Sequence, residues 1–376
     1  MPAPLPMAHL NGAVIAIAEA RVPALDRGFL FADGVYEAIA VYDGRPFRLA
    51  EHLSRLARSL RELRIAEPHD PPTWRALIEA LVAANGGGTM TVYLQVTRGA
   101  ELARDHAFPG NLEPTVFACC FAWSGPPEAL LKNGVAVVTQ PDVRWGRCDI
   151  KSINLTANVL ARQAAVDAGA SEAIFVRDGF ALEGSSSSLM IVEGNSIITP
   201  PDGPHILPGT TRNLLRELSA QIELTWVAEP VTIERLRATE EIWIASTTRE
   251  VLAVTRLDGS MVGNGRPGPI WQRMHGAVRA HVGGFLAGAA SGAAAIVQYP
   301  VVLPLKIIGQ AAPGLRERVL ALIAEHATVE AESVRERTSG GARYLALTVS
   351  VQVESREALE ALYAALRASD DVVWAL

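Results

Sequence analysis

Three lysines stand out in a chain of 376 residues whose 34 basic side chains are otherwise all arginines. Arginine keeps its proton, whereas a lysine withdrawn from water can release its proton and act as a nucleophile. Lys151 lies between Ile150 and Ile153, directly before a helical pattern, and is the candidate for such an amine. Lys132 lies in a turn-like stretch and Lys306 in a strand-like run without a partner motif. The ordinary alternative for Lys151 is a buried ion pair.

Two hydroxyl-rich stretches and one carboxylate could complete a site. Thr210 and Thr211 open a helical pattern, where free N–H groups and the helix dipole favour a phosphate. Ser246 and Thr247 follow a strand-like run and could add hydroxyl donors. Glu183 ends another strand, where a carboxylate could hold a protonated ring nitrogen. Taken singly, these features are also typical of a helix cap, a solvated loop and a surface acid.

A lysine, a set of hydrogen-bond donors for a phosphate and a carboxylate are together what pyridoxal 5′-phosphate requires. The lysine forms a Schiff base with the cofactor aldehyde, and the donors hold the phosphate. The acid keeps the pyridine ring protonated, so that the ring can accept electrons. The sequence therefore predicts an enzyme that depends on this cofactor.

The composition excludes several other classes. The net charge of −6 argues against a nucleic-acid partner, because such proteins usually carry a basic surface. Three cysteines without metal-site or disulfide spacing are typical of a reducing compartment, and no export signal is evident, so we expect a cytoplasmic protein. The uncharged stretch 283–297 is short and rich in Gly, Ala and Ser, which favours a linker over a membrane span.

The elements that must position these residues fall into an α/β (α+β) pattern with several domains. We predict a small N-terminal α/β domain over 1–123, a large cofactor-binding domain over 124–285, a linker over 286–296 and a further domain over 297–376. Leucines at helical spacing predict a helix over 50–63, which carries Arg55. The last domain reads as β-α-β-β-α-β, the ferredoxin-like order.

Ordered motifs over residues 1 to about 285 resemble the fold-type IV pyridoxal-phosphate aminotransferases, most closely those that act on D-amino acids. The motifs are Asp26-Arg27-Gly28-Phe29, Asp33-Gly34-Val35-Tyr36-Glu37, Glu51-His52-Leu53-Ser54-Arg55-Leu56, Thr97-Arg98-Gly99, Arg104-Asp105-His106, Arg147-Cys148-Asp149-Ile150-Lys151-Ser152, Glu183-Gly184-Ser185-Ser186-Ser187 and Ser246-Thr247-Thr248. Ser188 departs from this pattern, because the family more often has asparagine there.

The resemblance implies a role for each matching residue. Lys151 is similar to the lysine that bonds the cofactor and moves the substrate proton. Glu183 resembles the carboxylate on the pyridine nitrogen, and Arg144 a residue that orders the site. The remaining matches resemble the phosphate holders Arg55, Thr210, Thr211, Ser246 and Thr247, and the trap for the substrate carboxylate formed by Tyr36, Arg104 and His106. In the family, the arginine and histidine of that trap come from a partner subunit, so a homodimer is implied.

The expected reaction is transamination between a D-amino acid, such as D-alanine, and a 2-oxo acid, such as 2-oxoglutarate. Sister activities that share the cofactor motifs are branched-chain aminotransferase and aminodeoxychorismate lyase. A different possibility is a non-catalytic regulatory protein. Residues from about 297 to 376 resemble the YbeD/DUF493 family through Gln298-Tyr299-Pro300 and Ile307-Ile308-Gly309-Gln310-Ala311, and a regulatory or dimerising role there rests on fold analogy alone.

Overall fold

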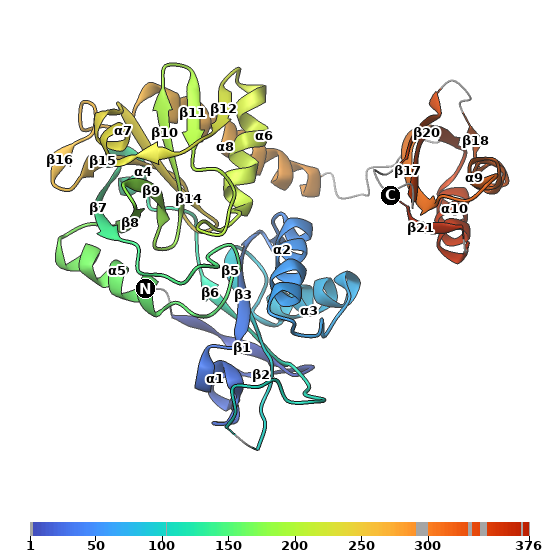
Figure 1. Cartoon of the computed structure of the whole chain (residues 1–376), viewed down its shortest axis with the longest axis horizontal. Helices are drawn as coiled ribbons and strands as arrows, with labels where there is room; N and C mark the ends of the chain where they lie inside the picture. The colour runs from blue at the N-terminus through green and yellow to red at the C-terminus, as the bar shows by residue number, and fades with distance from the viewer. Residues whose placement is uncertain are drawn as a thin grey trace. The chain divides into compact units, whose positions relative to one another are not determined.

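The computed structural model describes residues 3–102, 104–290, 300–329, 333–338, 344–369 and 371–375. The chain forms two compact units, Met1–Leu286 and Ala287–Leu376. In the described residues, the first unit contains two sheets with their helices, and the second contains a further sheet with helices packed against it (Figure 1). The mixed α/β architecture with an additional C-terminal domain agrees with the predicted fold class.

The first sheet of the larger unit has six antiparallel strands in the order β2-β1-β6-β5-β3-β4. Its strands are β1 (Pro4–Leu10), β2 (Ala13–Ala16), β3 (Gly34–Tyr42), β4 (Arg45–Pro46), β5 (Met90–Thr97) and β6 (Thr115–Ala122). The hairpin of β1 and β2 turns at Asn11 and Gly12, where φ is +46° and +92°, as a tight hairpin turn requires.

Two longer helices, α2 (Leu49–Glu62) and α3 (Pro71–Ala84), pack beside this sheet (Figure 1). Leu53, Leu56 and Leu60 of α2 form the predicted leucine stripe and are buried against β3 and β5. Short helical segments η1 (Ile17–Glu19) and α1 (Arg27–Phe31) lie between β2 and β3. The sequence prediction missed α1, because one turn of helix is too short to show a periodic pattern.

The second sheet has ten strands and mixed direction. Its strands are β7 (Val135–Pro141), β8 (Glu172–Arg177), β9 (Phe180–Gly184), β10 (Ser188–Glu193), β11 (Ser196–Thr199), β12 (Thr225–Ala228), β13 (Val231–Thr232), β14 (Glu241–Ser246), β15 (Glu250–Leu257) and β16 (Ser260–Met261). Six of them, β10-β14-β15-β7-β8-β9, form a closed ring, because Ser188 at the start of β10 pairs with Glu183 near the end of β9.

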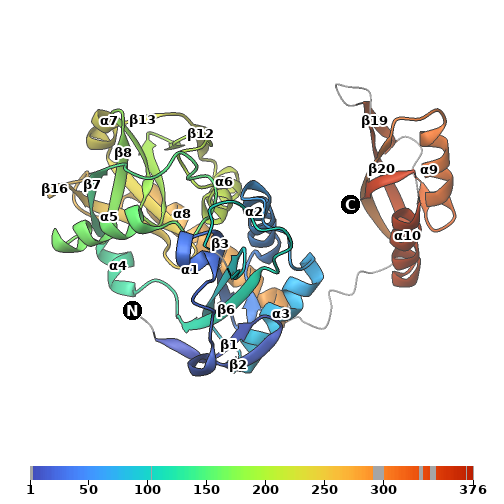
Figure 2. The ribbon, with the colours of Figure 1, turned by 60° about the horizontal axis from the view of Figure 1, so that its bottom comes forward.

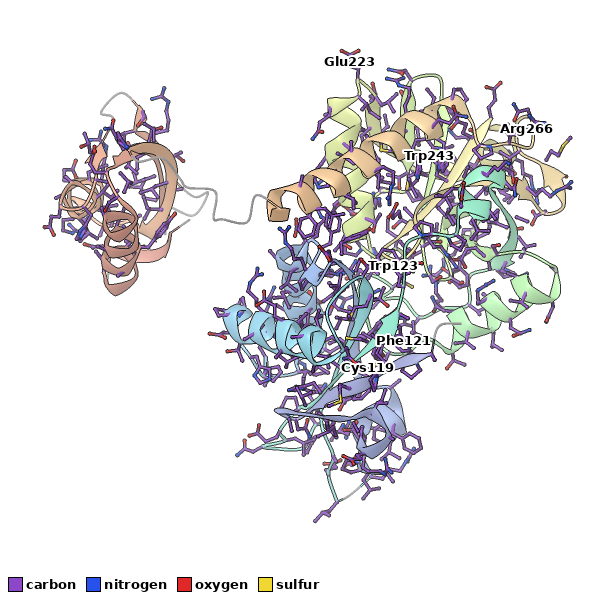
Figure 3. The ribbon with its side chains drawn as sticks, turned by 180° about the vertical axis from the view of Figure 1, so that it is seen from behind. Cys119, Phe121, Trp123, Glu223, Trp243 and Arg266 are labelled. Carbon is purple, nitrogen blue, oxygen red and sulfur yellow. The ribbon has the colours of Figure 1, made fainter. Side chains whose placement is uncertain are left out.

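Five helices accompany this sheet: α4 (Glu128–Asn133), α5 (Thr156–Asp167), α6 (Thr210–Gln221), α7 (Ile233–Ala238) and α8 (Pro269–Ala290). Helix α5 runs along β7 and β8 (Figure 2). Trp243 of β14 is fully buried beneath α6 and α8, whereas Glu223 and Arg266 lie at the periphery (Figure 3). Trp271 and Met274 of α8 belong to the same apolar cluster.

Helix α8 corrects one prediction. The helix continues to Ala290, so that residues 286–290 of the expected linker are helical, while residues 291–296 lie outside the described part of the chain. Gly283 and Gly284 weaken a helix by about 1 kcal/mol each. Tertiary contacts hold the helix here: Val282 is buried, and Arg45 lies 4.3 Å from the ring centroid of Phe285.

The smaller unit has the sheet order β18-β20-β17-β21, with β19 also pairing β20, and all pairs are antiparallel. Its elements are β17 (Val301–Gln310), α9 (Leu315–Ala324), β18 (Thr328–Val329), β19 (Arg335–Thr338), β20 (Tyr344–Val353), α10 (Arg356–Ala368) and β21 (Val372–Ala375). This is the ferredoxin-like arrangement predicted from the sequence. Leu305, Val349 and Ile323 contribute to a core that lies within this unit.

Candidate active site

A cavity of about 270 Å³ is lined by residues of both sheets of the larger unit. Nearly all residues predicted from the sequence to bind cofactor or substrate line it, namely Tyr36, Arg55, Arg144, Lys151, Glu183, Thr210, Thr211, Ser246 and Thr247. The walls come from β3, α2, the segment before α5, the β9–β10 turn, the start of α6 and the β14–β15 loop. Segments far apart in the sequence therefore meet around one space of ligand size.

Lys151 is fixed on the wall of the cavity by backbone pairing. Its carbonyl accepts a hydrogen bond of 3.0 Å from the N–H of Tyr36, and its own N–H donates to Ser59 Oγ at 3.3 Å. Nζ lies 4.3 Å from the ring centroid of Tyr36. Within the described part of the chain, Nζ has no carboxylate partner at ion-pair distance. A buried ion pair therefore does not account for this lysine.

Glu183 lies in a second part of the cavity, inside a network of buried charges. One of its oxygens accepts from Arg144 and the other accepts from the N–H of Leu207 at 3.0 Å. Arg144 also bonds Asp142 at 2.9 Å and lies 4.2 Å from the ring centroid of Phe175. Burial raises the pKa of Glu183, and Arg144 and the Leu207 N–H oppose that rise. Arg144 thus orients Glu183 toward the cavity.

The third part of the cavity is a set of donors suited to an anion. Helix α6 begins at Thr210 without a side-chain cap, so its first N–H groups face the cavity with the hydroxyls of Thr210 and Thr211. Arg55 is buried and is held by Glu37, at 2.7 and 2.8 Å, and by the carbonyl of Pro208 at 3.0 Å. Two of its five N–H groups remain for a ligand. Arg55 lies off the leucine stripe of α2, and the structure buries it on Glu37.

The β9–β10 turn is held from behind by Glu172, which is completely buried. Its carboxylate accepts hydrogen bonds from the hydroxyls of three consecutive serines, Ser185, Ser186 and Ser187, and from Arg249. Sequence reasoning missed Glu172 and Arg249. The available signals were a carboxylate within an apolar strand and an arginine directly after Ser246-Thr247-Thr248.

Ser188, where the sequence departs from the expected motif, lies at the start of β10 and is buried. A Cβ atom on Gly209 would lie 2.6 Å from its Oγ. The start of α6 and the start of β10 are therefore in close contact, and glycine is needed at the cap.

Arg104 and His106 do not line the cavity, and both side chains are exposed. The backbone at Asp105 and His106 is nevertheless held by hydrogen bonds. Buried Arg27 donates to the carbonyls of Asp105 and His106 at 2.7 and 3.2 Å, and Phe31 contacts both predicted side chains. One chain thus holds this pair in a defined conformation but does not bring it to its own Lys151.

Comparison with known proteins relates this geometry to a family. Residues 34–257 match the family model Amino-transferase class IV. A D-alanine aminotransferase of Bacillus licheniformis is 39% identical over 269 residues, which are 72% of this chain and 94% of that one. Another from Staphylococcus aureus is 38% identical over 266 residues, 70% of this chain and 94% of the relative. The chain belongs to the class IV aminotransferases.

Solved structures agree with this class IV aminotransferase assignment. A branched-chain amino acid aminotransferase of T.th. with pyridoxamine 5′-phosphate superimposes with a TM-score of 0.68 at 25% identity, covering 74% of this chain and 95% of that one. The fold-IV transaminase CpuTA1 of Curtobacterium pusillum gives a TM-score of 0.62 at 27% identity, covering 74% and 92%. Residues 294–376 match a second model, Protein of unknown function (DUF493).

The cofactor of this aminotransferase is pyridoxal 5′-phosphate. The residues of the cavity fit it, because an amine, a buried carboxylate and an uncapped helix start with an arginine match its aldehyde, ring nitrogen and phosphate. Within the described ranges, no group of three His, Cys, Asp or Glu side chains is placed to hold a metal ion. None of the described helices has the length and apolarity that crossing a bilayer requires.

Proposed function

We propose that the protein transfers the amino group of a D-amino acid, such as D-alanine, to a 2-oxo acid, such as 2-oxoglutarate. The observation that carries the proposal is the cavity in which Lys151, Glu183 and the start of α6 meet. When bound, the cofactor supplies an electron sink that stabilises negative charge at the substrate Cα. The protein must then hold the cofactor, move one proton and orient the substrate.

Each of these tasks has a candidate side chain. Lys151 is the proton carrier, because it lines the cavity and, among the described residues, its Nζ has no carboxylate within ion-pair distance. Glu183, oriented by Arg144, holds the ring nitrogen in its protonated form. Arg55, Thr210 and the N–H groups at the start of α6 hold the phosphate. The reaction as a whole is ping-pong, since donor and acceptor use the same cavity in turn.

The proposed preference for D-amino acids rests on the loop that carries Arg104 and His106. A carboxylate trap needs cations held in fixed positions, and Arg27 fixes the backbone of this loop. Because both side chains are exposed and away from their own cavity, we infer a homodimer in which they complete the partner's cavity next to its Tyr36. The relatives named D-alanine aminotransferase support this preference. Three buried, unpaired cysteines support a cytoplasmic location.

The competing activity is that of a branched-chain aminotransferase, which the similarity to the T.th. enzyme favours. Purified full-length protein is assayed with D-alanine, L-leucine and aminodeoxychorismate under the same conditions. We expect turnover of D-alanine at a rate at least about tenfold above that of L-leucine. Brisk turnover of L-leucine without D-alanine activity would replace our proposal by the branched-chain reaction, and release of product from aminodeoxychorismate alone would replace it by the lyase.

The role of Lys151 is tested by substitution. Lys151→Ala is expected to lower kcat by at least about 1,000-fold. Lys132→Ala is the matched control, because that lysine is exposed and does not line the cavity. Reduction of the holoenzyme with borohydride, followed by peptide mapping, should label Lys151. Label on another residue would refute the assignment of Lys151. A protein that gains no absorbance band when the cofactor is added would favour a non-catalytic role.

A further inference from the structure

Among the described residues of one chain, four cations line the cavity: Arg55, Arg144, Lys151 and Arg249. In the proposed function, Arg55 binds the phosphate, Arg144 orients Glu183 and Lys151 is the reacting amine. Arg249 is left without a role, although it faces the same space. It belongs to the three-residue loop between β14 and β15 that also carries Thr247, so it lies two residues after the last of the predicted phosphate holders.

The guanidinium of Arg249 is held in place by only some of its N–H groups. Its side chain is 22% exposed, and it donates to Glu172 and, at 3.5 Å, to the carbonyl of Ser171. A guanidinium has five N–H groups. Among the described residues, the other three N–H groups have no partner. An arginine held from behind can receive a planar carboxylate at low entropic cost.

The ordinary explanation of Arg249 would be a purely structural ion pair with Glu172. The surroundings of Glu172 indicate that this pair is not the whole role of the arginine. Besides Arg249, the carboxylate already accepts from three serine hydroxyls and from the N–H of Ala173 at 3.0 Å. Its hydrogen-bonding capacity is therefore met without the arginine, whose remaining contribution to Glu172 is the positive charge that balances this buried carboxylate. A fully committed arginine would also be buried with its acid, whereas this one reaches the cavity.

We propose that Arg249 is a specificity-determining residue that binds the second, distal carboxylate of a dicarboxylic substrate. The site would favour a five-carbon dicarboxylate such as D-glutamate or 2-oxoglutarate over D-alanine or pyruvate. This inference rests on the proposed function, since it concerns the same cavity. The other three cations of the chain are already assigned, and Arg104 and His106 of the partner subunit are assigned to the first carboxylate of the substrate. The distal charge would otherwise face the carboxylate of Glu183 and neutral hydroxyls in a partly dehydrated site.

The test follows single half-reactions of the holoenzyme by its absorbance, with D-glutamate and D-alanine in separate experiments. In Arg249→Gln, we expect the apparent Kd for D-glutamate to rise at least about tenfold. The value for D-alanine should change less than about twofold. Arg256→Gln is the matched control, because this arginine lies on the same β15 but is exposed and outside the cavity. The reverse half-reaction should give the same contrast between 2-oxoglutarate and pyruvate.

Arg249→Lys is a second variant in case Arg249→Gln does not fold. It keeps a positive charge beside Glu172 but lacks the planar guanidinium that can bind a carboxylate through two N–H groups. We expect it to weaken D-glutamate binding more than D-alanine binding. Equal losses for both substrates, or no loss for either, would overturn the inference while wild-type turnover of D-alanine leaves the proposed function intact. Absence of D-amino acid turnover in the wild type would instead overturn the proposed function.

Discussion

At the scale of single residues, Glu37 shows how the part of the cavity that we propose to hold the phosphate is built. It is completely buried and binds two other buried side chains, His52 at 2.7 Å and Arg55 at 2.7 Å. Burial alone would raise the pKa of Glu37, but the charges and hydrogen bonds of Arg55 and His52 outweigh burial and hold its pKa well below the ordinary 4.5. The carboxylate is therefore charged in the folded chain throughout the neutral range.

This depressed pKa makes a prediction about acid stability. An acid whose pKa is lower in the folded than in the unfolded chain stabilises the fold above its unfolded pKa, and this contribution is lost as the pH falls below that value. Glu37→Gln should lower the free energy of unfolding by about 3 kcal/mol near neutral pH. The difference from wild type should narrow as the pH falls below 4.5. Urea unfolding across this range measures it, and a difference that stays constant with pH would contradict the assignment.

Glu183 provides a second test at this scale. In the proposed function, Glu183→Gln removes the negative charge that keeps the ring nitrogen protonated, and it leaves Arg144 paired with Asp142. We expect kcat to fall by about 100-fold while cofactor remains bound through its phosphate. Steady-state kinetics and absorbance of the purified variant measure both quantities. Exposed Glu223 at the periphery (Figure 3) supplies the control variant Glu223→Gln, and unchanged kcat in Glu183→Gln would speak against the role.

At the scale of elements, the start of α6 depends on its close approach to β10. Gly209→Ala would place a Cβ 2.6 Å from Ser188 Oγ and 3.3 Å from Arg212 Cβ, so one of the two elements must move. We expect a loss of about 1–3 kcal/mol in the free energy of unfolding, together with weaker cofactor binding. Adding Ser188→Ala should restore at least half of the loss. A double-mutant cycle by urea unfolding checks this, and strictly additive effects would contradict a contact between the two positions.

Patterns within one element could be read from the sequence, whereas partnerships between elements could not. The leucines of α2 predicted that helix correctly, and Asn11-Gly12 is a sequence typical of the tight turn that joins β1 and β2. Strand β15 was missed, because it is buried on both faces and shows no alternation. Within the site, Lys151 was evident as a rare residue type. Glu172 was not, because its partner Arg249 lies 77 residues away and nothing local indicates that pairing.

At the scale of the whole molecule, the chain has two units that each contain a core of their own. The described residues that line the candidate site all belong to the larger unit. Phe285 of α8 also packs within this unit, against Phe47 and Arg45. The C-terminal unit is thus expected to be dispensable for the chemical step.

A chain that ends at Ala290 tests this expectation. It keeps all of α8 and removes the DUF493-like unit. We expect kcat within about twofold of the full-length value. The melting temperature of the larger unit should stay within a few degrees of its value in the full-length protein, which corresponds to a change of about 1 kcal/mol in the free energy of unfolding. A chain that ends at Gly268 is the control and should fail to fold, because Trp271, Met274 and Val278 are buried in the core. A large loss of activity in the first chain would assign a catalytic or scaffolding role to the smaller unit.

The closed ring of strands has one more consequence. The residues that close it, Glu183 and Ser188, flank the turn that lines the cofactor cavity. The pairing that closes the ring therefore also shapes the cavity, and a bound cofactor stabilises the folded chain by mass action. In cells starved of vitamin B6, newly made chains would lack this stabilisation as they leave the ribosome, and less folded protein would accumulate from the same amount of messenger RNA.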